Sequence, residues 1–208
     1  MTAAAILAEG VASLGLDLPP EAGERLLTYL DLLEKWNRVY NLTAVRERDN
    51  MVIYHLLDSL AVLPYVSGKR VADIGTGAGL PGMVLAMVDP QRQYYLVESN
   101  SKRTAFMQQA RMQLQLDNVE VVAKRVEDWQ PEEKMDCILS RAFAELELFI
   151  RLTRHLLAPG GVWLALKGQY PADELARLPG IRLAESIKLA VPMLEGERHV
   201  LKLEPTST

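Results

Sequence analysis

Apolar residues recur at helical spacing in the first third of the chain. Over residues 21–40 they form a single stripe, which predicts an amphipathic helix, at Leu26, Leu30, Leu33 and Trp36. The polar residues Asn41 and Thr43 break this pattern. A second helix is predicted over residues 50–63, where Pro64 stops it. This part of the chain therefore reads as helical.

From residue 70 onward, short apolar runs alternate with helical segments. The runs typical of buried strands are residues 70–74, 93–98, 118–123, 135–140 and 162–167. Helices are predicted at residues 81–89, 101–115 and 145–157, the last ending near Pro159. Pro81 suits the first turn of its helix, and Ser99 or Ser101 is the expected cap of the next one. This alternation predicts βαβ units with right-handed crossovers and a mainly parallel sheet.

The end of the chain departs from this alternation. Two apolar runs, residues 187–191 and 199–203, are joined by only a few residues, so an antiparallel hairpin is expected. The predicted fold class is α/β, with a doubly wound, mainly parallel seven-stranded sheet and an antiparallel C-terminal edge hairpin. We expect an N-terminal helical cap over residues 1–66 and a Rossmann-like core over residues 67–208, together forming one compact unit.

Composition narrows the class of protein. The chain has 208 residues, of which 49% are hydrophobic, so it can bury a substantial core. Cys137 is the single cysteine, which excludes a disulfide framework and a multi-cysteine zinc site. Because residues 1–15 lack the basic region of a secretory signal and no apolar run is long enough to span a membrane, we expect a cytoplasmic protein. The net charge of −4 argues against coating nucleic acid by charge alone, but it allows a local basic face.

A glycine-rich loop follows the first predicted strand. Four glycines fall within eight residues, at Gly75, Gly77, Gly79 and Gly82. Residues 77–82 fit the pattern GxGxxG between a strand and a helix, a context that favours nucleotide binding over a simple tight turn. Glu98 ends the second strand, where a carboxylate can accept both hydroxyl hydrogens of a ribose. The loop therefore predicts a site for a nucleoside-containing cofactor.

Two features favour S-adenosylmethionine over a dinucleotide. Asp73 stands just before the turn, where it can orient a cationic amino-acid end, and Gly75 extends the pattern to GxGxG. The antiparallel tail pair also suits methyltransferases better than dehydrogenases. The one Tyr-x-x-x-Lys of the kind that short-chain dehydrogenases need, Tyr65 to Lys69, lies upstream of the loop and contains Gly68. A dinucleotide-dependent reductase, a methyltransferase for small molecules or proteins, and a non-enzymatic nucleotide sensor remain as alternatives.

Seven segments, in matched order along nearly the whole chain, resemble the bacterial small-subunit ribosomal RNA guanine-nitrogen-7 methyltransferases, the glucose-inhibited division protein B family. They are residues 36–45, 55–60, 73–82, 98–106, 140–146, 165–168 and 196–199. The most specific of them is GTGAGLPG followed by an acid-Ser-x-x-Lys-Arg stretch, although an aspartate is common in the family where this chain has Glu98. Either acid can hold a ribose.

The resemblance implies a class I S-adenosylmethionine methyltransferase that modifies nitrogen-7 of a guanine in small-subunit (16S) ribosomal RNA, free or within the assembled subunit. It implies that Gly75 and Leu80 line the cofactor, that Val126 and Glu127 flank the adenine, and that Arg141 acts on the cofactor side. The full expected cofactor set is Asp73, Gly75, Gly77, Gly79, Leu80, Glu98, Val126, Glu127 and Arg141. Arg141 and Lys167 are the candidate catalytic residues, and a monomer without metal is expected.

The sequence offers no general base, and the implied chemistry needs none. Guanine nitrogen-7 has an in-plane lone pair and no hydrogen, so positioning can carry the reaction. The histidines His55, His155 and His199 lie far apart in sequence, and His55 also reads as a helix histidine satisfied by a neighbour.

Several cations are candidates for contact with RNA phosphates. They are Lys102, Arg103, Lys124, Arg125 and Arg198, with Lys167 as a further one. For Arg198 an ion pair with Glu195 or Glu197 is the alternative reading. The target base should be unpaired or splayed, because the deep groove of A-form RNA hides nitrogen-7.

Overall fold

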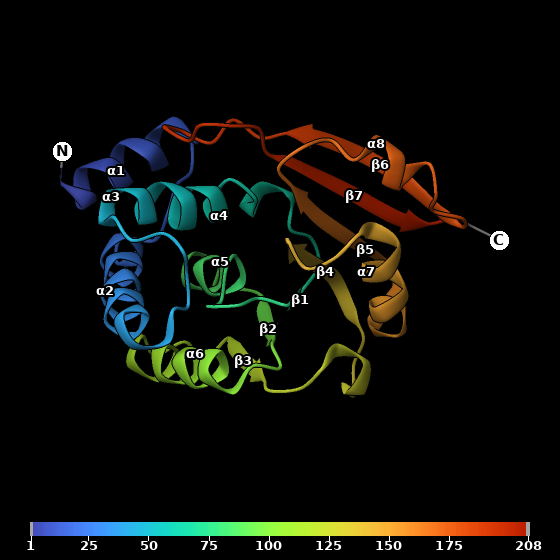
Figure 1. Ribbon diagram of the computed structural model, residues 1–208, viewed down its shortest axis with the longest axis horizontal. Coiled ribbons are helices and arrows are strands. Elements are labelled where there is room, and N and C mark those ends of the chain that lie inside the picture. Colours follow the sequence, from blue (N-terminus) through green and yellow to red (C-terminus); the bar gives the residue numbers. More distant parts are fainter. Residues whose placement is uncertain (1, 207–208) are drawn as a thin grey trace.

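A computed structural model describes residues 2–206 as a seven-stranded sheet with helices on both faces (Figure 1). The strands are β1 (Arg70–Ile74), β2 (Gln93–Val97), β3 (Val119–Val122), β4 (Met135–Arg141), β5 (Leu157–Lys167), β6 (Ile181–Lys188) and β7 (His199–Pro205). Their order across the sheet is β3-β2-β1-β4-β5-β7-β6. Because β7 pairs antiparallel with both β5 and β6 while β1 to β5 pair in parallel, the expected sheet and C-terminal hairpin are confirmed.

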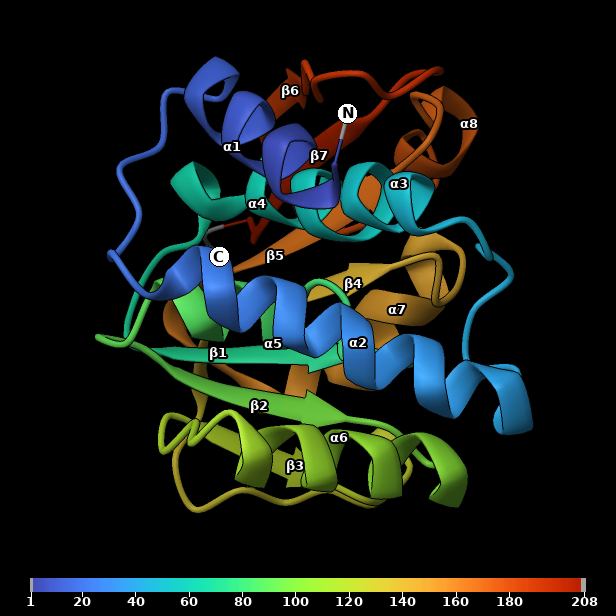
Figure 2. The same ribbon diagram turned by 90° about the vertical axis from the view of Figure 1, so that its left-hand side faces the viewer.

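The α-helices are α1 (Ala3–Ser13), α2 (Ala22–Tyr40), α3 (Arg48–Met51), α4 (Asp58–Leu60), α5 (Gly82–Val88), α6 (Ser101–Gln113), α7 (Leu146–Thr153) and α8 (Ala172–Leu175). A π-helical segment, Val52–Leu57, joins α3 to α4, and 3₁₀ turns occur at Leu63–Tyr65, Val126–Asp128 and Arg154–Leu156. Figure 2 shows α1, α2 and α6 in front of the sheet, whereas α7 covers the other face.

The N-terminal helices share one core with the sheet. The predicted stripe of α2 is buried at Leu26, Leu30 and Leu33, and Trp36 packs edge-on against Phe106 of α6. Full burial of such apolar side chains contributes roughly 1.5–3 kcal/mol each, so this contact fixes α2 firmly on the α5 and α6 layer.

Several predicted boundaries are wrong in detail. The cap of α6 is Asn100, whose Oδ1 accepts hydrogen bonds from the N–H groups of Lys102 and Arg103, and not Ser99 or Ser101. Helix α5 begins at Gly82, with Pro81 at the position before its first residue.

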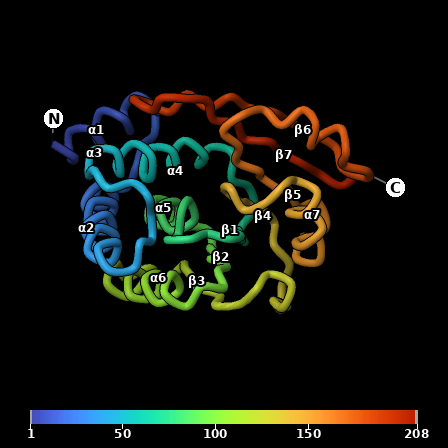
Figure 3. The backbone as a smooth tube through the Cα atoms, in the orientation of Figure 1, coloured from blue at the N-terminus to red at the C-terminus, as the bar shows by residue number. Residues whose placement is uncertain are grey.

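Two segments near the end of the chain also differ from the expectation. Helix α7 ends at Thr153, earlier than expected, and Pro159 lies within β5. Strand β6 ends at Lys188, so most of residues 187–191 belongs to the connection that follows. This connection, residues 189–198, runs over α1 and α4 before it returns to β7 (Figure 3).

Candidate active site

The glycine loop lies at the carboxyl end of β1, next to β4, where the strand order reverses. Open α/β sheets bind ligands at this position. Gly77 has a φ of +64°, and a Cβ built on it would meet nothing within 4 Å. By contrast, a Cβ on Gly82 would lie 2.4 Å from Cδ2 of Leu96. Gly77 thus leaves its backbone open to a ligand, and Gly82 allows helix α5 to pack closely on the sheet, as expected.

Asp73 lies beneath the loop and is fully buried. Its Oδ2 accepts hydrogen bonds from the hydroxyl of Thr76, at 2.6 Å, and from the N–H of Gly82, at 2.8 Å. Its Oδ1 has no hydrogen-bond partner within residues 2–206. Burial raises the pKa of Asp73 to about 6, although the bonds from Thr76 and Gly82 and the charge of Arg141 oppose this rise.

Glu98 reaches the same loop from the end of β2. Its Oε2 accepts a hydrogen bond from the N–H of Gly77, at 3.1 Å, and its Oε1 accepts one from the N–H of Asn100, at 2.9 Å. Arg103 forms an ion pair with this carboxylate at 3.4 Å. The structure therefore places Arg103, a predicted phosphate-binding residue, beside a predicted cofactor-binding residue.

A cavity of about 170 Å³ opens next to Glu98. Six predicted site residues line it together: Gly75, Glu98, Lys124, Arg125, Val126 and Glu127. Lys124 and Arg125 thus lie with the predicted cofactor residues, although the sequence assigned them to RNA. Gly77, Gly79 and Leu80 do not line this cavity.

Phe143, which is not among the predicted site residues, closes one side of this cavity. A Cβ on Gly75 would lie 2.4 Å from Cδ2 of Phe143, so the aromatic ring rests directly on the glycine backbone. Phe143 also packs edge-on against Phe149 of α7. Because Gly75 has no side chain, Phe143 can cover the loop.

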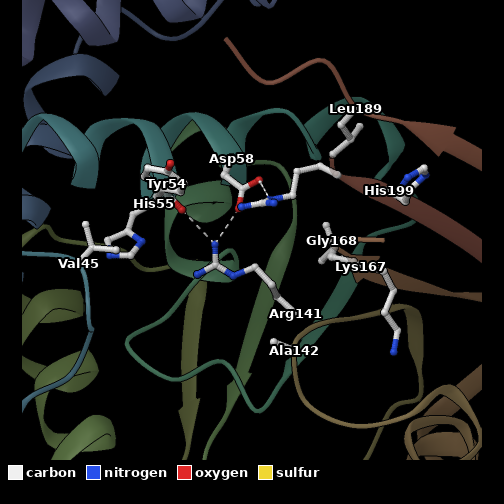
Figure 4. Close-up of a pocket in the computed structure, with 12 residues that line it drawn as sticks. Val45, Tyr54, His55, Asp58, Arg141, Ala142, Lys167, Gly168, Leu189 and His199 are labelled. Carbon is white, nitrogen blue, oxygen red and sulfur yellow. Dashed lines mark hydrogen bonds and ion pairs between the residues drawn. The ribbon is translucent and has the colours of Figure 1, made fainter. Parts of the chain in front are cut away.

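A second cavity, of about 310 Å³, lies on the other side of the segment that follows β4. Arg141 and Ala142 line this larger cavity, whereas Phe143 lines the smaller one. Tyr54, His55, Asp58 and Lys167 surround Arg141 in Figure 4. Residues 141–143 therefore separate two neighbouring cavities at the carboxyl end of the sheet.

The π-helical segment Val52–Leu57 shapes one wall of the larger cavity. Its carbonyl at Tyr54 accepts a hydrogen bond from Nη1 of Arg141, at 3.3 Å. Such segments are frequent at functional sites. His55, from the same segment, is bonded through Nε2 to Oγ1 of Thr43, at 2.9 Å. Burial, helped by the charge of Arg141, lowers the pKa of His55 to about 4, so the imidazole is neutral at physiological pH.

Asp58 joins two of the predicted site residues. Its Oδ2 lies 3.1 Å from Nη1 of Arg141, and its Oδ1 lies 3.0 Å from Nε of Arg198. The alternative that Arg198 pairs with the Glu195 or Glu197 carboxylate is wrong. Arg198 donates to Glu197 only at the backbone carbonyl.

Among the described residues, the remaining predicted cations form no ion pair with Asp58. Nζ of Lys167 donates to both carboxylate oxygens of Glu174, at 3.1 and 3.0 Å, although its stem lines the larger cavity. Lys102 is exposed, and its Nζ lies 5.6 Å from the ring centre of Tyr40. Leu80 is buried in the core.

These residues fit S-adenosylmethionine. The open backbone at Gly77, the free Oδ1 of Asp73 and the nearly buried carboxylate of Glu98 match the needs of a cationic ligand that carries a ribose. Within the described residues, no group of His, Cys, Asp and Glu has the arrangement of a metal site. No helix in residues 2–206 is long and apolar enough to cross a membrane.

Solved structures with a similar fold include methyltransferases. The chain matches the DhpI–SAH complex with a TM-score of 0.58 and 16% identity, over 90% of this chain and 98% of that one. It matches an S-adenosylmethionine-dependent methyltransferase from Aquifex aeolicus with a TM-score of 0.56 and 20% identity, over 74% and 92% of the two chains. At these identities the likeness concerns the fold.

Sequence comparison is more specific. The chain is 51% identical over 197 residues to the ribosomal RNA small subunit methyltransferase G of Methylobacillus flagellatus, covering 95% of this chain and 96% of the relative. It is 53% identical over 198 residues to the protein of the same name from Laribacter hongkongensis, with the same coverage. The family model GidB, described as rRNA small subunit methyltransferase G, matches residues 22–201. The chain therefore belongs to the GidB family of small-subunit ribosomal RNA methyltransferases.

Proposed function

We propose that this protein uses S-adenosylmethionine to methylate nitrogen-7 of a guanine in small-subunit ribosomal RNA, by positioning the reactants and without a general base. The supporting observation is the pair of cavities that meet at residues 141–143, one beside the glycine loop and Glu98, the other beside two arginines. A nucleoside-bearing cofactor and a splayed base fit side by side in such an arrangement.

The smaller cavity is the proposed adenosine site. Glu98 would accept the ribose hydroxyl hydrogens, and Val126 and Glu127, at the start of the 3₁₀ turn after β3, would flank the adenine. The free Oδ1 of Asp73 is the proposed partner of the cationic amino group. The carboxylates of Asp73 and Glu98 each accept hydrogen bonds from backbone N–H groups, so little ordering of these two groups remains to be done on binding.

S-adenosylmethionine, when bound, supplies a methyl group on a sulfonium sulfur, which the in-plane lone pair of guanine nitrogen-7 can attack with no proton to remove. The chain then has to align the base and keep water out. His55 fits this reading, because its Nδ1 is buried and its Nε2 is already bonded to Thr43. Arg141 lies between the two cavities, where it can reach a nucleotide that is held in the larger one.

The larger cavity is the proposed guanine site. Its arginines Arg141 and Arg198 suit an RNA strand, whose phosphates carry the charge, while Lys167 lines the same cavity with its Nζ paired to Glu174. The target should be an unpaired nucleotide, since side chains cannot reach nitrogen-7 in a paired A-form helix. Lys102, exposed at the start of α6, is a further candidate for phosphate contact. We expect a monomer that acts in the cytoplasm, on free RNA or on the assembled subunit, without metal.

The test is transfer of a labelled methyl group to unmethylated small subunits, and in parallel to the RNA extracted from them, from cells that lack the family's gene. Digestion to nucleosides then identifies the product. Label in 7-methylguanosine supports the proposal, and the more active of the two substrates identifies the natural one. Label in another nucleoside, or in ribosomal protein, would contradict it.

A further inference from the structure

Asp58 is a nearly buried carboxylate placed between two guanidinium groups. Its side chain is only 6% exposed, and it points from α4 towards the end of β4 (Figure 4). One oxygen receives Nη1 of Arg141 and the other receives Nε of Arg198. Arg141 and Arg198 lie 83 and 140 positions after Asp58 along the chain, so the bridge exists only in the folded protein.

The bridge leaves several donors of both arginines free. Nη1 of Arg141 is committed to Asp58 and to the carbonyl of Tyr54, and Nη1 of Arg198 to the carbonyl of Glu197. Nε and Nη2 of Arg141 and Nη2 of Arg198 have no hydrogen-bond partner in the part of the chain that the structure describes. Both side chains line the larger cavity and are about a quarter exposed, at 26% and 28%.

The charges of this cluster favour an anion. Two guanidinium groups and one carboxylate sum to one positive charge at the wall of the cavity. Without the carboxylate, the two like charges would repel each other in a partly desolvated place, and each arginine would move towards water. Asp58 therefore keeps the two groups near one another with their free N–H groups available.

Stability alone does not account for this arrangement. Buried ion pairs often add little net stability, because desolvating the charges costs about as much as their attraction returns. Arg141 and Arg198 also reach Asp58 from two different elements, from the end of β4 and from the residue before β7. This geometry suits a clamp for a ligand with several acceptor oxygens.

We propose that Asp58 is a positioning residue, which holds Arg141 and Arg198 so that their free N–H groups bind phosphate oxygens of the RNA strand at the target nucleotide. This inference rests on the proposed function and adds the way in which the RNA is held. Asp58 itself does not touch the RNA. It acts through the two arginines.

The test combines Asp58→Asn, Arg198→Ala and the double variant, assayed for methyl transfer to unmethylated small subunits and for binding of S-adenosylhomocysteine. Asp58→Asn keeps the size of the side chain and removes the charge. We expect the KM for subunits to rise about tenfold in either single variant, with cofactor affinity within about twofold of the unmodified protein. The KM of the double variant should not exceed that of the more impaired single variant, because both changes break the same Asp58–arginine bridge.

The matched control is Asp136→Asn. Asp136 also accepts hydrogen bonds from an arginine, Arg70, but it lies at the amino ends of β1 and β4, at the opposite end of the sheet from the cavity. Asp136→Asn should lose about as much thermal stability as Asp58→Asn does, while its KM for subunits stays unchanged.

Two results would overturn the inference while leaving the proposed function intact. In the first, the unmodified protein transfers the methyl group and the KM for subunits is unchanged in Asp58→Asn. In the second, the effects of Asp58→Asn and Arg198→Ala on this KM are additive in the double variant.

If Asp58→Asn does not fold, Arg198→Ala alone tests the inference. Its plot of log affinity for RNA against log salt concentration should be shallower by about one unit, and an unchanged slope would also overturn the inference. Absence of methyl transfer by the unmodified protein would instead overturn the proposed function.

Discussion

The hydroxyl of Tyr29, in α2, donates a 2.8 Å hydrogen bond to the carbonyl of Ala78, in the middle of the glycine loop. Tyr29 is fully buried, and this burial raises the pKa of its hydroxyl well above the ordinary value. The N-terminal helices thus hold the loop directly, in addition to covering the sheet.

The bond can be tested with Tyr29→Phe. This change leaves the buried carbonyl of Ala78 without a partner, so the free energy of unfolding should fall by roughly 1–3 kcal/mol. Affinity for S-adenosylhomocysteine should fall as well, because the loop loses its support. Urea unfolding and calorimetry measure the two effects. Tyr170→Phe, at an exposed position, should change neither, and equal behaviour of the two variants would contradict this role of Tyr29.

Gly77→Val tests the loop as a cofactor site. The added side chain occupies the open space over the loop, and cofactor affinity should fall more than about tenfold. Gly160→Val is the matched control, since Gly160 has a φ of +75° and a built Cβ there meets nothing within 4 Å. Both variants carry similar backbone strain. If calorimetry shows the same cofactor affinity in both, the loop is not the site.

Asp73 gives the protein a pH dependence of known sign. Its pKa rises from 3.8 in the ordinary state to about 6 in the folded protein, so the folded state binds the proton more tightly than the unfolded chain. This contribution to stability is complete below about pH 4 and is lost as the pH rises through about 6. Asp73→Asn stays neutral. Without cofactor, the variant should therefore gain up to roughly 3 kcal/mol relative to the unmodified protein between these two pH values. Denaturant unfolding across this range checks it, and a difference that does not change with pH would contradict it.

Lys102 and Arg103 are neighbours with different expected roles. Lys102→Ala should weaken RNA binding and leave cofactor affinity unchanged, because Lys102 is exposed beside Tyr40. Arg103→Ala should weaken cofactor binding, because Arg103 pairs with Glu98. Filter binding of RNA and calorimetry of the cofactor separate the two effects. A loss of cofactor affinity in Lys102→Ala would show that the assignment of Lys102 to RNA binding is wrong.

The order and type of the core elements could be predicted because each buried strand is a short apolar run. The less regular parts could not. Strand β6 alternates only weakly between half-buried and exposed positions, so the sequence shows no clear strand pattern there. The first strand of the hairpin was therefore predicted too late, at the stronger apolar run of residues 187–191. Asn100 replaced the expected serine caps because its backbone is extended and its side chain reaches two N–H groups at once. Both outcomes depend on geometry that spacing does not encode.

In the site, too, residues that are close in sequence could be predicted and residues brought together only by the fold could not. Glu98 and the glycine loop were predicted because they are close in sequence and follow consecutive strands. Asp58 was missed because its partners come from distant segments, although a lone acid inside the apolar run at residues 55–60 was a usable signal. Phe143 lies in the segment 140–146 that resembles the family, but only its contact with Gly75 in the structure marks it as a site residue. Family membership then decided between a methyltransferase and the dinucleotide-dependent alternative.

We propose that the protein positions guanine nitrogen-7 for methyl transfer and removes no proton. The most direct measurement is the single-turnover rate of 7-methylguanosine formation in small-subunit RNA at saturating cofactor, from about pH 6.5 to about pH 8.5. Transfer without a general base predicts a rate constant that does not change across this range. A rate that rises about tenfold per pH unit to a plateau, or a labelled product other than 7-methylguanosine, would contradict it.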